Sequence, residues 1–163
     1  MKHLKNYINE SSIKSMLKNL IKLNLGEAQL NFYKWKLKSY KSVKIVSYKS
    51  DPQLKILIDK HLIRNKINLK DCYTNSFDCA NKVQGVSYIE GEFLVHGVPI
   101  EHAWNKYKNI YFDLTSEVLL NDIKKSEYVK YIELDTKNLM KYALKLGYKG
   151  PFISEYYDEN ILK

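Results

Sequence analysis

The sequence contains few cysteines, which can cross-link a fold, and few prolines and glycines, which interrupt helices and strands. Its 163 residues include two cysteines, three prolines and six glycines. Two cysteines cannot build the disulfide framework of a small secreted domain, and Cys72 and Cys79 share one helical face, which argues against a bond between them. The glycines are scattered, so the sequence has neither a phosphate-binding loop nor a dinucleotide-binding fingerprint.

Long hydrophobic runs are also missing. No stretch approaches the ~20 apolar residues that a helix needs to cross a bilayer. Near the N-terminus, Lys14, Lys18 and Lys22 interrupt every candidate for the apolar segment of a signal peptide. We therefore expect a soluble protein of the cytoplasm, a reducing compartment, with no membrane partner.

Arginine is nearly absent, because one arginine stands against 26 lysines. Recognition of bases and phosphates usually uses the planar fork of arginine, so specific nucleic-acid binding is not favoured. The charge is nevertheless uneven, since residues 1–70 hold 15 lysines and the arginine against four acidic residues. This basic part could attract an anionic partner, although a coding bias toward lysine explains the same composition.

What is present is typical of a globular protein, with 45% hydrophobic and 28% charged residues. A chain of 163 residues fits one domain with its own core. We divide that domain into a basic, mostly helical part over 1–70, a core of helix and sheet over 71–135, and a helical part over 136–163.

Hydrophobic periodicity, caps and turn residues predict the elements. Helices are expected over 12–25 (capped by Ser11 or Ser12), 27–40, 51–62, 71–83, 136–146 (capped by Thr136) and 152–161. Strands are expected over 86–95, 100–105, 109–114 and 128–134, with turns at 97–99 and 106–108 and an extended segment at 43–48. Helices, then an antiparallel sheet, then helices indicate an α+β fold.

Three residues in the central part have the order and context of a thiol triad. Cys72 falls at a predicted helix start, where unpaired backbone N–H groups stabilise a thiolate. His102 follows in a strand, and Asp113 comes after a tight turn on the next strand. A carboxylate that binds one imidazole nitrogen leaves the other nitrogen facing the sulfur. The expected roles are nucleophile for Cys72, general base and then acid for His102, and orienting group for Asp113.

The same stretch resembles the core of the transglutaminase-like superfamily, whose members are related to papain. The matching pieces are Cys72, the strand Tyr88-Ile89-Glu90-Gly91, the strand His102-Ala103-Trp104, and the strand end Asp113-Leu114-Thr115. The resemblance implies a papain/transglutaminase-like core, with the cysteine helix packed on an antiparallel sheet that bears His and Asp, plus extra N-terminal helices. It covers about 45 residues, and Leu114 stands where the family commonly has proline.

Other polar residues near these motifs are candidates for binding a substrate. Asn75 lies one helical turn after Cys72, Glu90 lies in the strand before His102, and Asn105 follows in the strand of His102. Trp104 is predicted to be a core residue on the sheet face opposite His102.

A zinc site is the alternative for some of the same residues. Cys72, Cys79, His96 and His102 are four possible ligands, but their spacing is looser than in structural zinc sites, and Asp113 would have no role. We expect Cys79 in the core, His96 in a turn, and neither a metal nor a cofactor.

These features predict a thiol-dependent enzyme that transfers acyl groups. The expected substrate is a protein, a peptide or a small amide. The superfamily includes hydrolases and enzymes that transfer acyl groups to amines; hydrolysis is the expected reaction and amine transfer the second, and nothing in the sequence fixes the choice. The alternative is a non-catalytic binding module on the same scaffold, whose basic N-terminal helices hold nucleic acid or another anionic partner.

Overall fold

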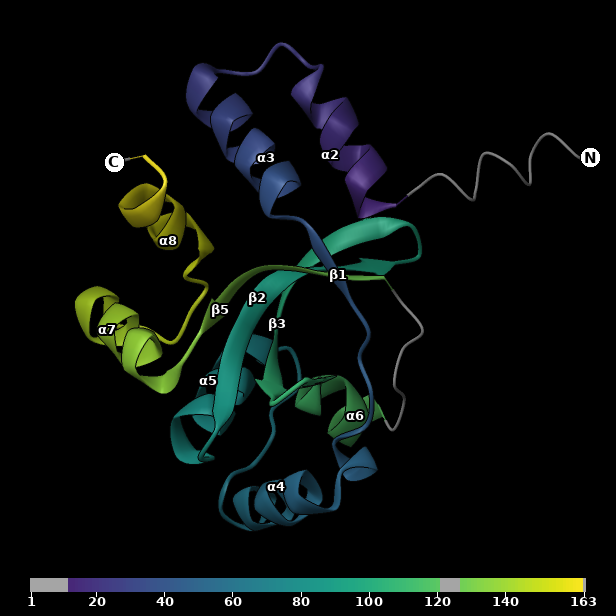
Figure 1. Ribbon diagram of the computed structural model, residues 1–163, viewed down its shortest axis with the longest axis vertical. Coiled ribbons are helices and arrows are strands. Elements are labelled where there is room, and N and C mark those ends of the chain that lie inside the picture. Colours follow the sequence, from purple (N-terminus) through teal and green to yellow (C-terminus); the bar gives the residue numbers. More distant parts are fainter. Residues whose placement is uncertain (1–11, 121–126, 163) are drawn as a thin grey trace, which may run out of the picture.

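The computed structural model describes residues 12–120 and 127–162, which form an α+β fold of helices around a curled antiparallel sheet (Figure 1). The α+β class predicted from the sequence is therefore confirmed. The helices in the described part are α2 (Ile13–Ile21), α3 (Glu27–Ser39), α4 (Pro52–Arg64), α5 (Cys72–Lys82), α6 (Leu114–Leu120), α7 (Thr136–Leu146) and α8 (Ile153–Asn160). The strands are β1 (Lys41–Val43), β2 (Val86–Val95), β3 (Val98–Tyr107), β4 (Ile110–Phe112) and β5 (Tyr128–Leu134).

The sheet has the strand order β1-β5-β2-β3-β4, and each neighbouring pair is antiparallel. Its centre is the long β2–β3 hairpin, closed by His96 and Gly97, which have φ angles of 50° and 82°. Positive φ at both central residues matches the twist of a two-residue hairpin turn. The predicted turn at 97–99 is therefore wrong, because Val98 and Pro99 already belong to β3.

The sheet curls until its two edges come together. After β1, Ile45 forms a bridge with Tyr111 of β4, and the N–H of Val46 donates to the Tyr111 carbonyl at 2.9 Å. The curl encloses a small apolar cluster that is separate from the main core. Its buried members are Ile89, Phe93, Trp104 and Tyr128.

The N-terminal helices begin where their caps predict. The Ser12 side chain accepts from the N–H of Ser15, and the Asp51 side chain accepts from the N–H of Leu54, with Pro52 in the first turn. The first helix is shorter than predicted, because it ends at Ile21 and not near residue 25. The alternative cap, Ser11, lies outside the described residues.

The region after β4 differs most from the prediction. The strand expected over 109–114 covers only Ile110–Phe112, and its turn lies at Lys108 and Asn109. The unpredicted helix α6 starts directly afterwards. It begins there because the Asp113 carboxylate accepts from the N–H of Ser116 and its carbonyl accepts from the N–H of Glu117, as an N-cap residue does.

The C-terminal helices cover the outer face of the sheet (Figure 1). The cap of α7 is Asp135 and not the predicted Thr136, whose hydroxyl instead donates to the Ala80 carbonyl at 3.1 Å. Gly147 ends α7 in the left-handed conformation, as the sequence predicts. Helix α8 follows over nearly the predicted range.

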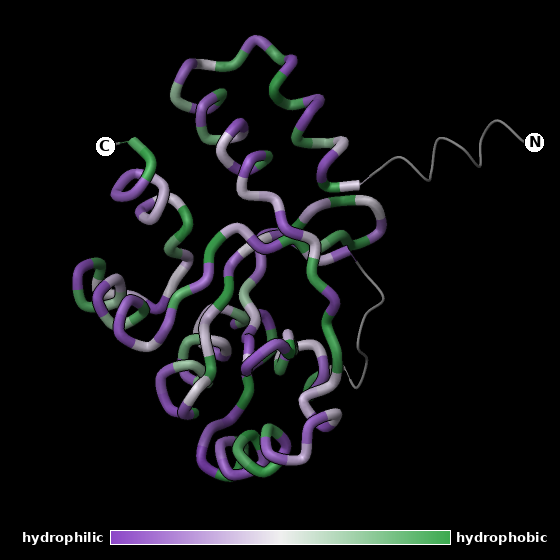
Figure 2. The backbone as a smooth tube through the Cα atoms, viewed as in Figure 1, coloured by the Kyte–Doolittle hydropathy of each residue, from purple (hydrophilic) through white to green (hydrophobic). Residues whose placement is uncertain are grey.

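The main core lies between the outer face of the sheet and the helices. Its largest fully buried side chains include Tyr88, Phe112, Phe152 and Leu139. Figure 2 shows hydrophilic and hydrophobic residues interspersed along every helix, as expected for helices with one buried face. Within the described ranges, no helix combines the length and apolarity that a membrane span requires.

Candidate active site

Cys72 is the first residue of α5, and its side chain is partly exposed. The N–H groups of Cys72, Tyr73 and Thr74 begin the helix, so they have no intrahelical acceptor. Asp71 occupies the N-cap position, but its side chain makes no capping hydrogen bond to these groups. The N–H groups of the first turn of α5 therefore have no side-chain cap from Asp71. The positive end of the helix dipole lies beside Cys72.

His102 lies on the part of β3 that has no outer neighbour in the sheet. β4 pairs with β3 only from Asn105 to Tyr107, so the strand around His102 is paired with β2 alone. The side chain of Asn105 donates to the Ser76 carbonyl of α5 at 2.9 Å and ties that helix to β3. This arrangement brings the start of α5 to the open edge of β3, beside His102.

The three predicted triad residues are in contact. His102 Nε2 donates to Asp113 Oδ2 at 2.7 Å, and both side chains are buried. The imidazole also interacts with the Cys72 side chain, and this interaction raises the pKa of His102. Because Asp113 occupies Nε2, Nδ1 is the nitrogen available to the sulfur. The order Cys72, His102, Asp113 is the connectivity that a thiol triad needs.

Asp113 is held by more donors than the sequence indicated. Its Oδ2 accepts from the Ser116 hydroxyl at 2.7 Å and the Tyr128 hydroxyl at 3.0 Å, and its Oδ1 accepts from the Ser116 N–H at 3.1 Å. The cap spacing of Asp113 and Ser116 was visible in the sequence and could have revealed this pair. Tyr128 could not be found in that way, because it arrives from β5.

The electrostatics of the pair favour a charged imidazole. Burial lowers the pKa of His102, but the hydrogen bonds to Asp113 and Cys72 and the charges of both outweigh burial and raise this pKa to about 9. Burial raises the pKa of Asp113, but the hydrogen bonds and charge of His102 and the hydrogen bonds of Ser116 lower it overall. His102 is therefore an imidazolium at neutral pH, paired with an aspartate.

Aromatic rings surround the imidazole on the inner side of the curl. The ring centroid of His102 lies 4.6 Å from that of Phe93, 6.1 Å from that of Trp104 and 6.2 Å from that of Tyr128. The sequence analysis placed Trp104 in the core, which is confirmed, but on the opposite face from His102, which is wrong. Residues two apart in a strand point to the same face. These rings exclude water from the His–Asp pair.

All three predicted substrate-binding residues have hydrogen-bond partners within the protein. The Asn75 amide binds both the N–H and the carbonyl of Asn68 and donates to the Thr115 hydroxyl. Asn105 is fully buried and donates to the carbonyls of Ser76 and Ser87. Both side chains position α5 and the loop before it. Their amide hydrogens are used within the protein.

The third, Glu90, is a buried carboxylate on the outer face of the sheet. It accepts from the Tyr88 hydroxyl at 2.6 Å and from the N–H groups of Phe152 and Ile153, at the start of α8, at 2.7 and 2.9 Å. Burial raises the pKa of Glu90 to about 7, although these three hydrogen bonds act in the opposite direction. Glu90 thus anchors α8 to the sheet.

A buried ion pair that the sequence did not reveal links the N-terminal helices to β3, the strand of His102. Lys36 of α3 is buried, and its Nζ lies 2.7 Å from Glu92 and 3.4 Å from Glu101, the residue before His102. The Tyr131 hydroxyl donates to the second oxygen of Glu92 at 2.8 Å. Lysines on an amphipathic helix are normally exposed, so no pattern in the sequence singled out Lys36.

The alternative zinc ligands lie in different environments. Cys79 is fully buried in the core, and burial raises the pKa of its thiol. His96 is exposed at the hairpin turn. Across residues 12–120 and 127–162, no three His, Cys, Asp or Glu side chains are grouped as a metal site would need.

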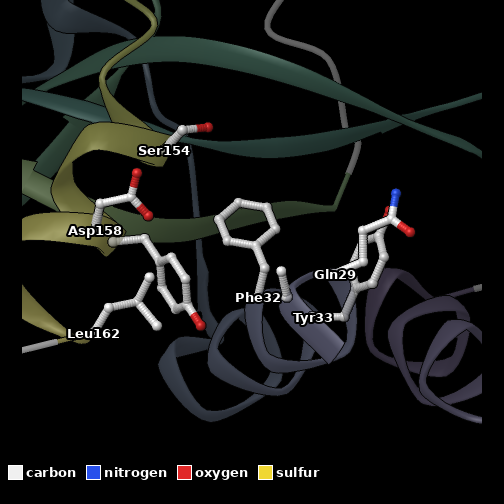
Figure 3. A pocket seen from close by; sticks show the side chains of 8 residues that line it. Gln29, Phe32, Tyr33, Ser154, Asp158 and Leu162 are labelled. Carbon is white, nitrogen blue, oxygen red and sulfur yellow. The ribbon is translucent and has the colours of Figure 1, made fainter. Parts of the chain in front are cut away.

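A separate cavity of about 430 Å³ lies between α3 and α8 (Figure 3). Phe32 and Tyr33 of α3 face Tyr157 and Leu162 at the C-terminal end of the chain across it. Cys72, His102 and Asp113 are not among the residues that line this cavity.

Comparisons with protein-family models, with curated proteins and with solved structures found no match to the chain.

Proposed function

We propose that the protein is a thiol-dependent enzyme that transfers acyl groups through an acyl-enzyme on Cys72. The observation that carries the proposal is the contact of His102 with both Cys72 and Asp113 at the start of α5. Packing of a histidine in a core does not require a buried aspartate on one side and a partly exposed cysteine on the other. Together they supply a nucleophile, a proton carrier and a group that fixes the imidazole orientation.

The chemistry follows from the atoms. The sulfur of Cys72 attacks the carbonyl carbon of an amide, and the proton on Nδ1 of His102 passes to the leaving nitrogen, so that the C–N bond breaks and an S–C bond remains. Water or an amine then attacks the thioester carbon and gives a proton back to Nδ1 of His102, while the S–C bond breaks, so that the acid or the new amide leaves and Cys72 is again a thiolate. Asp113 stays ionised and holds Nε2 throughout. Hydrolysis of an amide in a peptide or protein is the preferred reaction, and transfer to an amine is the second.

The start of α5 supports the same reaction in a second way. The negative oxygen of the tetrahedral intermediate develops next to Cys72, where the first N–H groups of the helix have no intrahelical acceptor. Donors fixed in this position stabilise such an oxyanion before the reaction begins. The Cys72 N–H is the donor nearest to the reacting atoms by covalent connection.

We also propose that the fold is a papain/transglutaminase-like core. Its support is the packing of α5 against β2 and β3, with the histidine on β3 and the aspartate at the end of β4. This is the arrangement that the resemblance of the motifs implies. The N-terminal helices are an addition to it, joined to the catalytic strand through Lys36.

An activated ester tests the proposal without knowledge of the natural substrate. Incubation with p-nitrophenyl acetate should give a burst of p-nitrophenolate and a protein acetylated at Cys72, located by peptide mass spectrometry. Cys72→Ala should abolish the burst, His102→Gln should slow it strongly, and the matched variant Cys79→Ala should retain it. Acetylation of lysines alone, or a burst that survives in Cys72→Ala, would refute the thiol mechanism.

Casein with a fluorescent amine then separates the two reactions. Fluorescent labelling of casein by the wild type and not by Cys72→Ala indicates amine transfer, and release of casein fragments indicates hydrolysis. A non-catalytic binding module, the alternative function, predicts that neither reaction occurs and that Cys72→Ala changes nothing.

A further inference from the structure

A groove with only positive charges lies at the far end of α5 from Cys72. Two cavities, of about 270 and 380 Å³, adjoin there along α4, because both are lined by Leu57 and Gln84. We call this surface the α4 groove. Lys82, at the end of α5, lines it, and 11 residues of helix separate it from the triad by ~15 Å.

The charged residues that line the α4 groove are all basic. They are Lys60, Arg64, Lys82 and Lys108, and Arg64 is the single arginine of the chain. No acidic residue is among the described residues that line either cavity. The groove also presents side-chain amides, from Gln53, Asn65 and Gln84.

The cations of the groove have little compensation. Lys60 and Arg64 lie one turn apart on an exposed face of α4, where like charges repel, and neither has an ion pair with the residues that the structure describes. Lys82 donates to Asn65 at 2.6 Å and lies 3.7 Å from Asp78. Asp78 is itself shared with Lys149 at 2.7 Å, so positive charge remains in excess.

His61, which also lines the groove, adds a buried donor. Its Nδ1 lies 3.2 Å from the side-chain amide nitrogen of Asn65, so Nδ1 accepts and Nε2 carries the hydrogen. Nε2 is buried and has no hydrogen-bond partner within the described part of the chain. Burial, and then the charge of Lys82, lower the pKa of His61, which keeps the imidazole neutral. Because this N–H is buried, it does not itself contact a ligand in the groove.

The C-termini of two helices lie at the α4 groove, but they do not make its electrostatic potential negative. α4 and α5 both end beside the groove, and each C-terminus has a partial charge of roughly −0.5. Together they offset about one of the positive charges near them, so the field in the groove stays positive. The partial negative charge at each helix C-terminus also stabilises the cationic side chains of Arg64 and Lys82, which lie there.

The shape of the groove and the types of donor select the ligand. The two joined cavities place Lys60, Arg64 and Lys82 at one end and Lys108 at the other, so a ligand that spans them carries more than one negative charge. Lysines contact phosphates as point charges, and such phosphate contacts carry no sequence information. The cavities are concave, which suits a flexible single strand better than a stiff duplex.

We propose that the α4 groove binds the phosphodiester backbone of single-stranded nucleic acid without sequence selectivity. The site is independent of the thiol chemistry, because it includes no triad residue. Binding through it therefore survives in Cys72→Ala, and its failure would leave the proposed enzyme function untouched.

The test is fluorescence anisotropy of a labelled 15-mer of thymidine, titrated with the full chain at several salt concentrations. The wild type should bind, with a salt slope of about −2.8 if four cations contact phosphates. Lys60→Gln/Arg64→Gln removes two contacts from exposed positions. It should reduce the slope by about 1.4 and weaken binding at 50 mM salt by roughly tenfold or more.

A matched variant distinguishes binding in the groove from a general effect of the protein's net charge. Lys34→Gln/Lys38→Gln removes the same charge from exposed positions on α3 and should leave the slope and affinity nearly unchanged. Equal losses in both variants, or no binding at 50 mM salt, would overturn the proposal. So would pyrophosphate binding as tightly as the oligonucleotide, because the groove would then be a site for a small anion.

Discussion

Replacing Asp113 by asparagine tests the His–Asp pair with little disturbance elsewhere. Asparagine caps helices about as well as aspartate, so α6 should still begin at the same residue. The change removes the charge that faces His102 Nε2, and asparagine cannot accept from all the donors that converge on Asp113. The variant therefore separates the electrostatic role of the residue from its role as a cap.

The size of the effect follows from the pKa of His102. A rise from 6.5 to about 9 corresponds to about 3 kcal/mol between the two protonation states. Because the folded-state pKa is the higher one, this stabilisation is complete below pH 6.5 and is lost as the pH rises through 9. Because Cys72 contributes part of this rise, Asp113→Asn should cost up to about 3 kcal/mol at pH 6. At pH 9.5, where only a neutral hydrogen bond to His102 is lost, it should cost about 1 kcal/mol.

Urea unfolding of both proteins at pH 6 and pH 9.5 measures the difference. Ser116→Ala is the control, because it removes one hydrogen bond to Asp113 and leaves the charge in place. It should cost about 1 kcal/mol at both pH values. If the cost of Asp113→Asn does not change with pH, His102 and Asp113 are not a charged pair in the folded protein, and the reasoning about the triad fails. Turnover of Asp113→Asn should also fall by roughly 10²-fold or more.

Three further predictions concern residues around the triad. Iodoacetamide should modify Cys72 in the native protein and leave the fully buried Cys79 unmodified, as peptide mass spectrometry will show; equal labelling would place Cys79 at the surface. Gly91→Ala should unfold the protein or cost more than about 3 kcal/mol in urea unfolding, since the added Cβ would lie 1.8 Å from the Val129 carbonyl oxygen, and a variant of normal stability would contradict the close packing of β2 and β5. Glu90, whose pKa is raised to about 7, binds more protons folded than unfolded between pH 4.5 and 7, so wild-type stability should fall as the pH rises through that window; thermal unfolding of Glu90→Gln should show a smaller change there, and an unchanged pH profile would rule out Glu90 as its source.

Much of the element order was predictable because its signals are local. Asp51 before Pro52, and Gly147 after an apolar helix, are caps that depend on a few neighbouring residues. The signals failed where two local choices compete. Val98 and Pro99 read as turn residues, but the two-residue turn at His96 and Gly97 suits the twist of the hairpin and leaves both in β3.

The candidate site was likewise predictable only in part. Cys72, His102 and Asp113 were chosen by residue type and spacing, and the structure brings them into contact. Asn75 and Asn105 were chosen as polar neighbours of the triad, but their amides bind backbone groups inside the protein. A sequence cannot distinguish these cases, because which way a polar side chain points depends on what packs against it.

The amino-acid sequence by itself determined the α+β class, the helix that starts at Cys72 and the order of the three triad residues. Each of these depends on periodicity, caps or turn residues within a short stretch of chain. The tertiary structure alone decided the donor from Tyr128, the burial of Lys36 against Glu92, and the grouping of Arg64 with Lys82 in the α4 groove. Most of these contacts join segments far apart in the chain, and they form only when the sheet curls and the helices pack around it.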